Sequence, residues 1–147
     1  MNRSGASRLA EVTLTPILIS LPIADRARSL DFYRDALDLE APGELADDGV
    51  PEPLIFVLND HARLMLVPTE GFDWVIGDHT VVAPGTSEVT LGISAASDDA
   101  VNTIIERASA AGAKVASEPA PQPWGYAAVF EDPDGHVWTV TSAQLPV

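Results

Sequence analysis

The residues of this chain that could do acid–base or metal chemistry are three histidines and the carboxylate Glu88. His61 lies in a predicted hairpin turn, His79 in a segment rich in Gly, Asp and Thr, and His136 beside a turn near the end of the sequence. Nothing in the sequence brings them together, so we expect each histidine to be solvent-exposed. Glu88 is the one candidate general base, if it faces an apolar cavity. The competing interpretation is a solvated carboxylate at the start of a strand.

The chain lacks the usual signs of nucleophilic catalysis. Ser20, Ser94 and Ser97 have neither a Gly-x-Ser-x-Gly turn nor a histidine partner nearby. The absence of cysteine excludes disulfides, thiolate nucleophiles and zinc sites of the cysteine type. There is also no glycine-rich phosphate loop. Covalent catalysis and phosphate binding are therefore not predicted.

Length and charge narrow the class of protein further. The 147 residues, 46% of them hydrophobic, suit one folded domain. The 22 acidic and 8 basic residues give a net charge of -14, which repels nucleic acid and anionic lipid. The same field would attract a cationic ligand. A second explanation of the negative charge is an acidic surface that maintains solubility. No apolar run approaches the ~20 residues of a membrane span and no secretion signal is visible, so we expect a cytoplasmic protein without membrane contact.

Two parts of the sequence repeat one order of predicted elements. Residues 14–23 have the pattern of a strand covered on both faces, and an amphipathic helix follows from the cap residue Asp25. Residues 54–67 then form a hairpin. The first unit is expected to span residues 13–67, after a flexible polar lead at residues 1–12.

The second unit begins with a strand at residues 88–95. Ser97 caps a helix with a continuous apolar stripe, and three strands follow, the last two joined by the tight turn 132–135. This unit is expected to span residues 88–143. Residues 68–87, between the units, have the composition of an ordered linker or lid.

Several motifs resemble the vicinal oxygen chelate superfamily, which includes glyoxalase I, extradiol dioxygenases and bleomycin-resistance proteins. They are LPIAD at 21–25, SLDFY at 29–33, AAGA at 110–113 and FEDPDGHVW at 130–138. Residues 64–69 and 87–91 are similar to a group labelled predicted lactoylglutathione lyases. The resemblance covers about residues 14–143 and implies an α+β fold. Two βαβββ modules would form a curved, cup-shaped mixed β-sheet with helices on its outer face, as one domain overall.

In metal-dependent members of this superfamily, His or Glu ligands come from the first and last strands of each module. Counting back from Asp25 and Ser97 locates the first-strand positions, and the strand patterns locate the last-strand ones. The four positions hold Leu18, Met65, Thr90 and Thr139. Alkyl, thioether and hydroxyl groups hold divalent ions poorly, so we expect no metal or other cofactor. The alternative is one divalent metal ion bound elsewhere, for example by Glu88 with His79 or His136.

The same four positions would then line a ligand cavity together with Trp74, Trp124 and Tyr126, which can stack on planar or cationic compounds. The leading hypothesis is a metal-independent protein that binds, and by analogy with drug-resistance members sequesters, an aromatic or cationic small molecule. We expect a homodimer, because related folds often complete their cups across two chains. One alternative is a metal-dependent lyase, isomerase or dioxygenase acting on a vicinal-oxygen substrate. Another is a partner-binding protein with a collapsed pocket.

Overall fold

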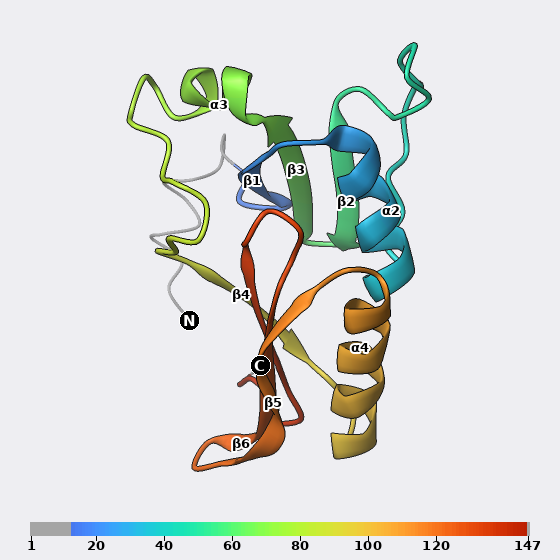
Figure 1. Cartoon of the computed structure of the whole chain (residues 1–147), viewed down its shortest axis with the longest axis vertical. Helices are drawn as coiled ribbons and strands as arrows, with labels where there is room; N and C mark the ends of the chain where they lie inside the picture. Colours follow the sequence, from blue (N-terminus) through green and yellow to red (C-terminus); the bar gives the residue numbers. More distant parts are fainter. Residues whose placement is uncertain (1–12, 147) are drawn as a thin grey trace.

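The computed structural model describes residues 13–146 and contains two units with a shared order of elements (Figure 1). The predicted lead at residues 1–12 lies outside the described residues. The elements in chain order are β1 (Ile17–Ile23), α2 (Arg26–Leu37), β2 (Leu54–Asn59), β3 (Ala62–Pro68), α3 (Thr69–Val75), β4 (Thr90–Ser94), α4 (Asp98–Ala110), β5 (Lys114–Gln122), β6 (Gly125–Glu131) and β7 (Val137–Thr141). The α+β fold class predicted from the sequence is confirmed.

Each unit builds its own mixed sheet. The strand orders are β1-β3-β2 and β4-β7-β6-β5. In both sheets the first strand runs parallel to the last one, which pairs antiparallel with the strand before it. The first sheet has three strands because the position equivalent to β5 holds only isolated bridges, between Glu40 and Val57 and between Leu45 and Pro51. Three prolines in residues 41–53 cannot donate ladder hydrogen bonds there.

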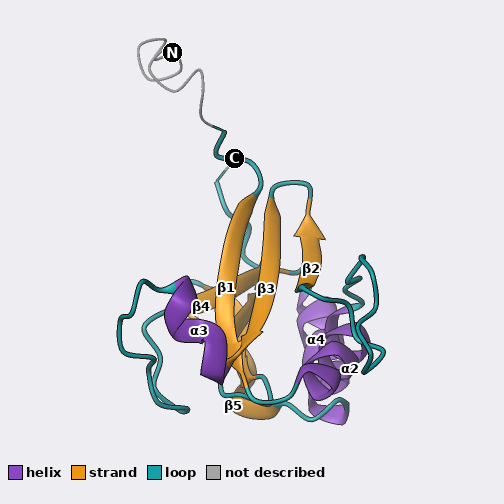
Figure 2. Ribbon diagram, turned by 90° about the horizontal axis from the view of Figure 1, so that it is seen from above, coloured by secondary structure: helices purple, strands orange, loops and turns teal. Residues whose placement is uncertain are grey.

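Helices α2 and α4 pack against each other and lie on the same side of the two sheets (Figures 1 and 2). Asp25 caps α2 by accepting a hydrogen bond from the Arg28 N–H at 2.9 Å, and Ser97 caps α4 in the same way. Both caps agree with the sequence prediction. Within residues 13–146, no helix combines the length and apolar character that crossing a membrane requires.

The two units share one hydrophobic core, centred on Tyr33 of α2. Its ring lies 5.3 Å from that of Phe56 in the first sheet and 5.8 Å from that of Trp138 in the second. Phe130 stacks on Trp138 with an interplanar angle of 2°. Because side chains from both sheets bury the same helix face, the two units form one cooperative core.

The segment between the units begins with the short helix α3, which the sequence analysis did not predict. This helix packs on β1 and β3, on the side of the sheet opposite α2 (Figure 2). Phe72 is buried beneath it, whereas Trp74 is 88% exposed. A helix of seven residues without a side-chain cap has little local signal, so its packing against the sheet decides its formation.

Candidate functional site

The four positions predicted for ligands all lie on the sheet faces turned away from α2 and α4. On β3, Leu64 and Leu66 are buried towards the helices, so Met65 between them faces the other way. Met65 is paired with Ser20, and Leu18 occupies the position two residues before Ser20 on β1. Leu18, Ser20 and Met65 therefore share one face of the first sheet.

The second sheet has the same arrangement. Trp138 and Val140 of β7 are buried towards the helices, so Thr139 between them faces the opposite side. Thr139 pairs with Gly92, and a Cβ at Gly92 would lie 3.4 Å from the Thr139 Oγ1. Thr90, two residues before Gly92, shares this face. We call the combined surface the inner face; it comprises Leu18, Ser20, Met65, Thr90, Gly92 and Thr139.

The inner face does not fit a divalent metal ion. The four positions predicted for ligands offer an alkyl chain, a thioether and two hydroxyls, none of which binds such an ion well in water. Across residues 13–146, no three His, Cys, Asp or Glu side chains gather closely enough to hold a metal ion together. The face is open: Leu18 is 49% exposed and Thr90 is also exposed. The role of these residues in binding a ligand stays a prediction.

The structure does not bring the three predicted aromatic residues together. Trp74 is exposed on α3, and Trp124 is 67% exposed at the turn between β5 and β6. Tyr126 lies on the helix side of the second sheet, where its hydroxyl donates to Asn102 Oδ1 of α4 at 2.7 Å. From the sequence we expect Tyr126 to line the same cavity as Thr139. The two side chains instead lie on opposite faces of the second sheet, because Tyr126 shares the face of buried Ala128 and Phe130.

A cavity of about 260 Å³ lies between β1, α3, residues 76–89 and the turn that joins β6 to β7. We call it the junction cavity. Its apolar wall includes Pro22, Phe72, Ile76 and Val82. Its polar groups come from Ser20, Thr86, Ser87, Glu88 and His136. Because Ser20 also belongs to the inner face, the two regions adjoin.

A second cavity, of about 490 Å³, lies at the seam between the two sheets. β1 and β4 are terminal strands of their sheets, and both contribute to its wall together with the end of α2. Thr90 and Gly92 of the inner face line it beside Ile19 and Leu58. Both cavities thus adjoin the inner face.

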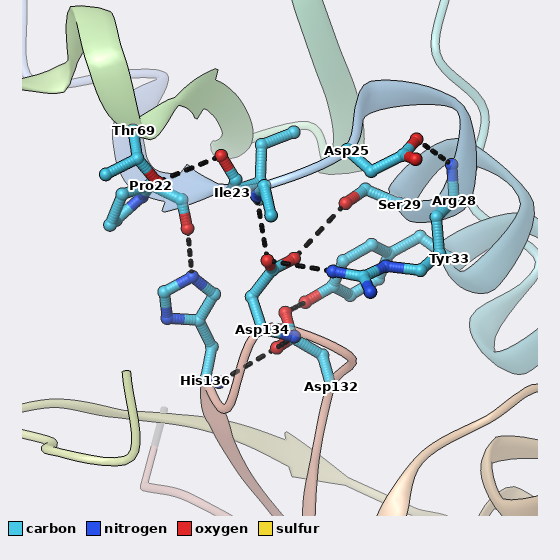
Figure 3. Close-up of polar contacts among 11 residues, drawn as sticks. Pro22, Ile23, Asp25, Arg28, Ser29, Tyr33, Thr69, Asp132, Asp134 and His136 are labelled. Carbon is cyan, nitrogen blue, oxygen red and sulfur yellow. Dashed lines mark hydrogen bonds and ion pairs between the residues drawn. The ribbon is translucent and has the colours of Figure 1, made fainter. Parts of the chain in front are cut away.

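Glu88 and His136 line the same junction cavity, although 48 positions separate them in the sequence. His79 lies outside this cavity and bonds the Ile76 carbonyl through Nδ1 at 2.7 Å. From the sequence we expect His136 to be solvent-exposed. It is instead half-buried, with Nε2 2.6 Å from the Pro22 carbonyl oxygen (Figure 3). A carbonyl oxygen only accepts, so Nε2 carries the proton.

The turn before His136, residues 132–135, is held against the start of α2 by hydrogen bonds to Asp134. Asp134 accepts hydrogen bonds from the Ala24 N–H at 2.8 Å, from the Arg28 guanidinium at 3.1 Å and from the Ser29 hydroxyl at 3.4 Å (Figure 3). Gly135 in the turn has a φ of 88°, which favours glycine. A Cβ there would also lie 3.3 Å from the Gly85 nitrogen, so residues 76–89 sit close against the turn.

Buried polar side chains next to this turn also connect the two units. Asp132 accepts from the Tyr33 hydroxyl at 2.5 Å, and the same hydroxyl accepts from Trp138 Nε1 at 3.0 Å. Burial raises the pKa of Asp132, while the charge interaction with His136 and the hydrogen bonds with Tyr33 and backbone N–H groups oppose that shift. Burial, followed by the charge of Asp132, raises the pKa of Tyr33 well above its usual value. These groups do not line the junction cavity, so we assign them to the connection between the two units.

Sequence and structure comparisons agree on the type of fold. The family model for the Glyoxalase/Bleomycin resistance protein/Dioxygenase superfamily matches residues 14–140. No curated protein matches the sequence. The hypothetical protein SA1046 from S. aureus has a similar structure, with a TM-score of 0.74 and 19% identity over 90% of this chain and 96% of that chain.

Two further solved structures have the same fold. A glyoxalase-related enzyme from Fulvimarina pelagi has a TM-score of 0.72 and 23% identity over 84% of each chain. TnmS3, an antibiotic-binding protein from Streptomyces sp. CB03234, has a TM-score of 0.62 and 23% identity over 90% of this chain and 98% of that chain. At these identities the likenesses show the fold alone. With the family match and the paired sheets, they establish that the chain belongs to the Glyoxalase/Bleomycin resistance protein/Dioxygenase superfamily.

Proposed function

We propose that this protein is a metal-independent small-molecule-binding protein. The observation that carries the proposal is the chemistry of the inner face, where Leu18, Met65, Thr90 and Thr139 occupy the positions at which the family resemblance implies metal ligands. Two cavities adjoin this face, which argues against a collapsed pocket. Further support comes from the fold shared with TnmS3, an antibiotic-binding protein.

The proposed ligand is an aromatic or cationic compound, and the proposed assembly is a homodimer. The net charge of -14 favours cations over anions. Ile17 and Leu18 at the open end of β1 are 54% and 49% exposed, and a second copy that covered them would bury apolar surface and close the inner face. Localisation in the cytoplasm is part of the same proposal.

The experiment that tests this function is a binding screen in the presence and absence of a metal chelator. Calorimetric titration with planar aromatic and cationic compounds should give saturable binding that the chelator leaves unchanged. Thr139→Trp should weaken it by filling the inner face. Thr103→Trp, the same substitution at an exposed position of α4, is the control. Binding that needs a metal ion, or that ignores Thr139→Trp, would contradict the proposal.

The alternative is a metal-dependent lyase, isomerase or dioxygenase. One observation favours it, namely that Glu88 and His136 line one cavity. Two ligands fall short of the three or more that protein sites for divalent ions usually provide. About one metal ion per chain after dialysis, lost on Glu88→Ala, would make this alternative the better one.

A further inference from the structure

The junction cavity has walls suited to a small apolar body. Its walls come from Pro22 of β1, Phe72 of α3, and Ile76 and Val82 of the segment that follows α3. Its volume of about 260 Å³ is just below the range of about 300–1,000 Å³ typical of sites for drug-sized ligands. The cavity therefore suits a compound smaller than most drugs.

The polar groups of this cavity include fixed hydrogen-bond acceptors. His136 holds its Nε2–H on the Pro22 carbonyl at 2.6 Å (Figure 3). In the neutral ring this leaves Nδ1 as an acceptor, and among the described residues no protein group occupies it. Glu88 adds a carboxylate, which only accepts when ionised. The Ser87 hydroxyl donates to the Val89 carbonyl at 2.7 Å and so can only accept from a ligand, whereas the hydroxyls of Ser20 and Thr86 can accept or donate.

The junction cavity has an acidic lining. Within the part of the chain that the structure describes, no lysine or arginine lines the junction cavity, and Glu88 supplies its carboxyl group. The whole chain adds a field of the same sign, with a net charge of -14. An anion would be repelled, whereas an ammonium group would gain charge-assisted hydrogen bonds.

The outer wall of the cavity is held by local hydrogen bonds. The hydrogen bonds that the structure shows within residues 76–89 are local, for example from the Asp78 N–H to the Asp73 carbonyl at 2.8 Å and from the Thr86 N–H to the Ala83 carbonyl at 3.1 Å. Val82 is 50% exposed. A segment held this way moves at low cost compared with a strand of the sheet, which provides a route for a ligand.

We propose that the junction cavity binds a small apolar ammonium ion. Its hydrocarbon body lies against Phe72, Ile76 and Val82, and its N–H groups donate to the Glu88 carboxylate and to His136 Nδ1. This inference rests on the proposed small-molecule-binding function and adds a location and a chemical class of ligand. It assigns to Glu88 a role in binding rather than in proton transfer.

The first experiment compares three probes of nearly equal size. The ¹⁵N-labelled full chain is titrated with 2-phenylethylammonium, 2-phenylethanol and phenylacetate while amide shifts are followed by NMR. The ammonium ion should give saturable shifts around Val82, Glu88 and His136 and bind at least about threefold more tightly than the alcohol. Phenylacetate should not saturate. Equal affinity for the ammonium ion and the alcohol, or shifts confined to the inner face, would overturn the inference.

The second experiment removes the charge. Glu88→Gln should weaken 2-phenylethylammonium by about three- to tenfold and leave 2-phenylethanol unchanged. Glu118→Gln, the same substitution at an exposed position of β5, is the matched control and should have no effect. An unchanged affinity for the ammonium ion in Glu88→Gln would contradict the proposed contact.

Failure of this inference is distinguishable from failure of the proposed function. If compounds from the wider screen bind and Thr139→Trp weakens them, while 2-phenylethylammonium perturbs no residue of the junction cavity, only the inference is wrong. If no compound binds without a metal ion, the proposed function fails and the inference fails with it.

Discussion

The helix side of the two sheets and the inner face differ in how much they contribute to the hydrophobic core. On the helix side, the described residues bury Tyr33, Asp132 and Trp138 together with their hydrogen-bond partners. No buried side-chain nitrogen or oxygen of the described residues lacks a partner. On the inner face, Leu18 and Thr90 are exposed and take no part in the core. The helix side therefore supports stability, while the inner face is available for a ligand or a second chain.

The largest expected effect comes from one substitution made on both sides. Leu64→Ala on the helix side should lower the free energy of unfolding by about 2–5 kcal/mol, because Leu64 is fully buried and its removal leaves a cavity. Leu18→Ala on the inner face should cost less than about 1 kcal/mol. Urea unfolding measures both. A cost for Leu18→Ala that grows with protein concentration would show that a second copy covers the inner face.

The buried hydroxyl of Tyr33 should have the next largest effect. Tyr33→Phe leaves both Asp132 Oδ2 and Trp138 Nε1 without the hydroxyl that they contact, so we expect a loss of about 1–3 kcal/mol. Tyr126→Phe removes a half-buried hydroxyl with a single partner, Asn102, and should cost less. Equal losses in the two variants would contradict the distinction between core and periphery.

Asp132 should make stability depend on pH. Its pKa is raised above the ordinary 3.8, so between 3.8 and the raised value the folded state binds more protons than the unfolded state. Stability from this group is complete below pH 3.8 and declines as pH rises through that window. Asp132→Asn should remove the decline. Unfolding of both proteins across this window, compared as a difference, isolates Asp132; a difference that is flat with pH would contradict the assignment.

The exposed link between the helices should have the smallest effect. Arg107 of α4 donates to Asp38 Oδ1 at 3.0 Å, and this hydrogen bond lowers the pKa of Asp38. Its stabilising effect is present above the ordinary pKa and is lost as pH falls through the lowered value. Arg107→Gln and Asp38→Asn, alone and combined, should reveal a small coupling that 1 M salt removes. A coupling unchanged by salt would indicate a contribution other than charge.

Local features of the sequence predict much of this fold. The capping residues Asp25 and Ser97 mark the starts of α2 and α4, because their side chains bond the first turn whatever the rest of the fold does. The period of two also places Leu18 and Thr139 on the sheet faces away from the helices. The family resemblance was confirmed, whereas the lactoylglutathione lyase-like group remains a prediction.

Other features depend on contacts between distant residues. Helix α3 forms where it packs on β1 and β3, and Tyr126 turns to α4 rather than to the inner face. The bond between His136 and Pro22 spans 114 positions, and no local pattern signals it. Glu88 and His136 lie far apart in the sequence, and only the folded structure brings both of them to the lining of the junction cavity.

The sequence by itself therefore determined the elements other than α3, the repeated order of the two units, the superfamily and the lack of suitable metal ligands at four strand positions. Those properties follow from side-chain type, capping and strand period, which are local. Only the tertiary structure decided where α2 meets the turn at residues 132–135 and which polar groups face the junction cavity. Such contacts arise when both sheets bury the same face of α2, and burial of that kind is a property of the assembled core.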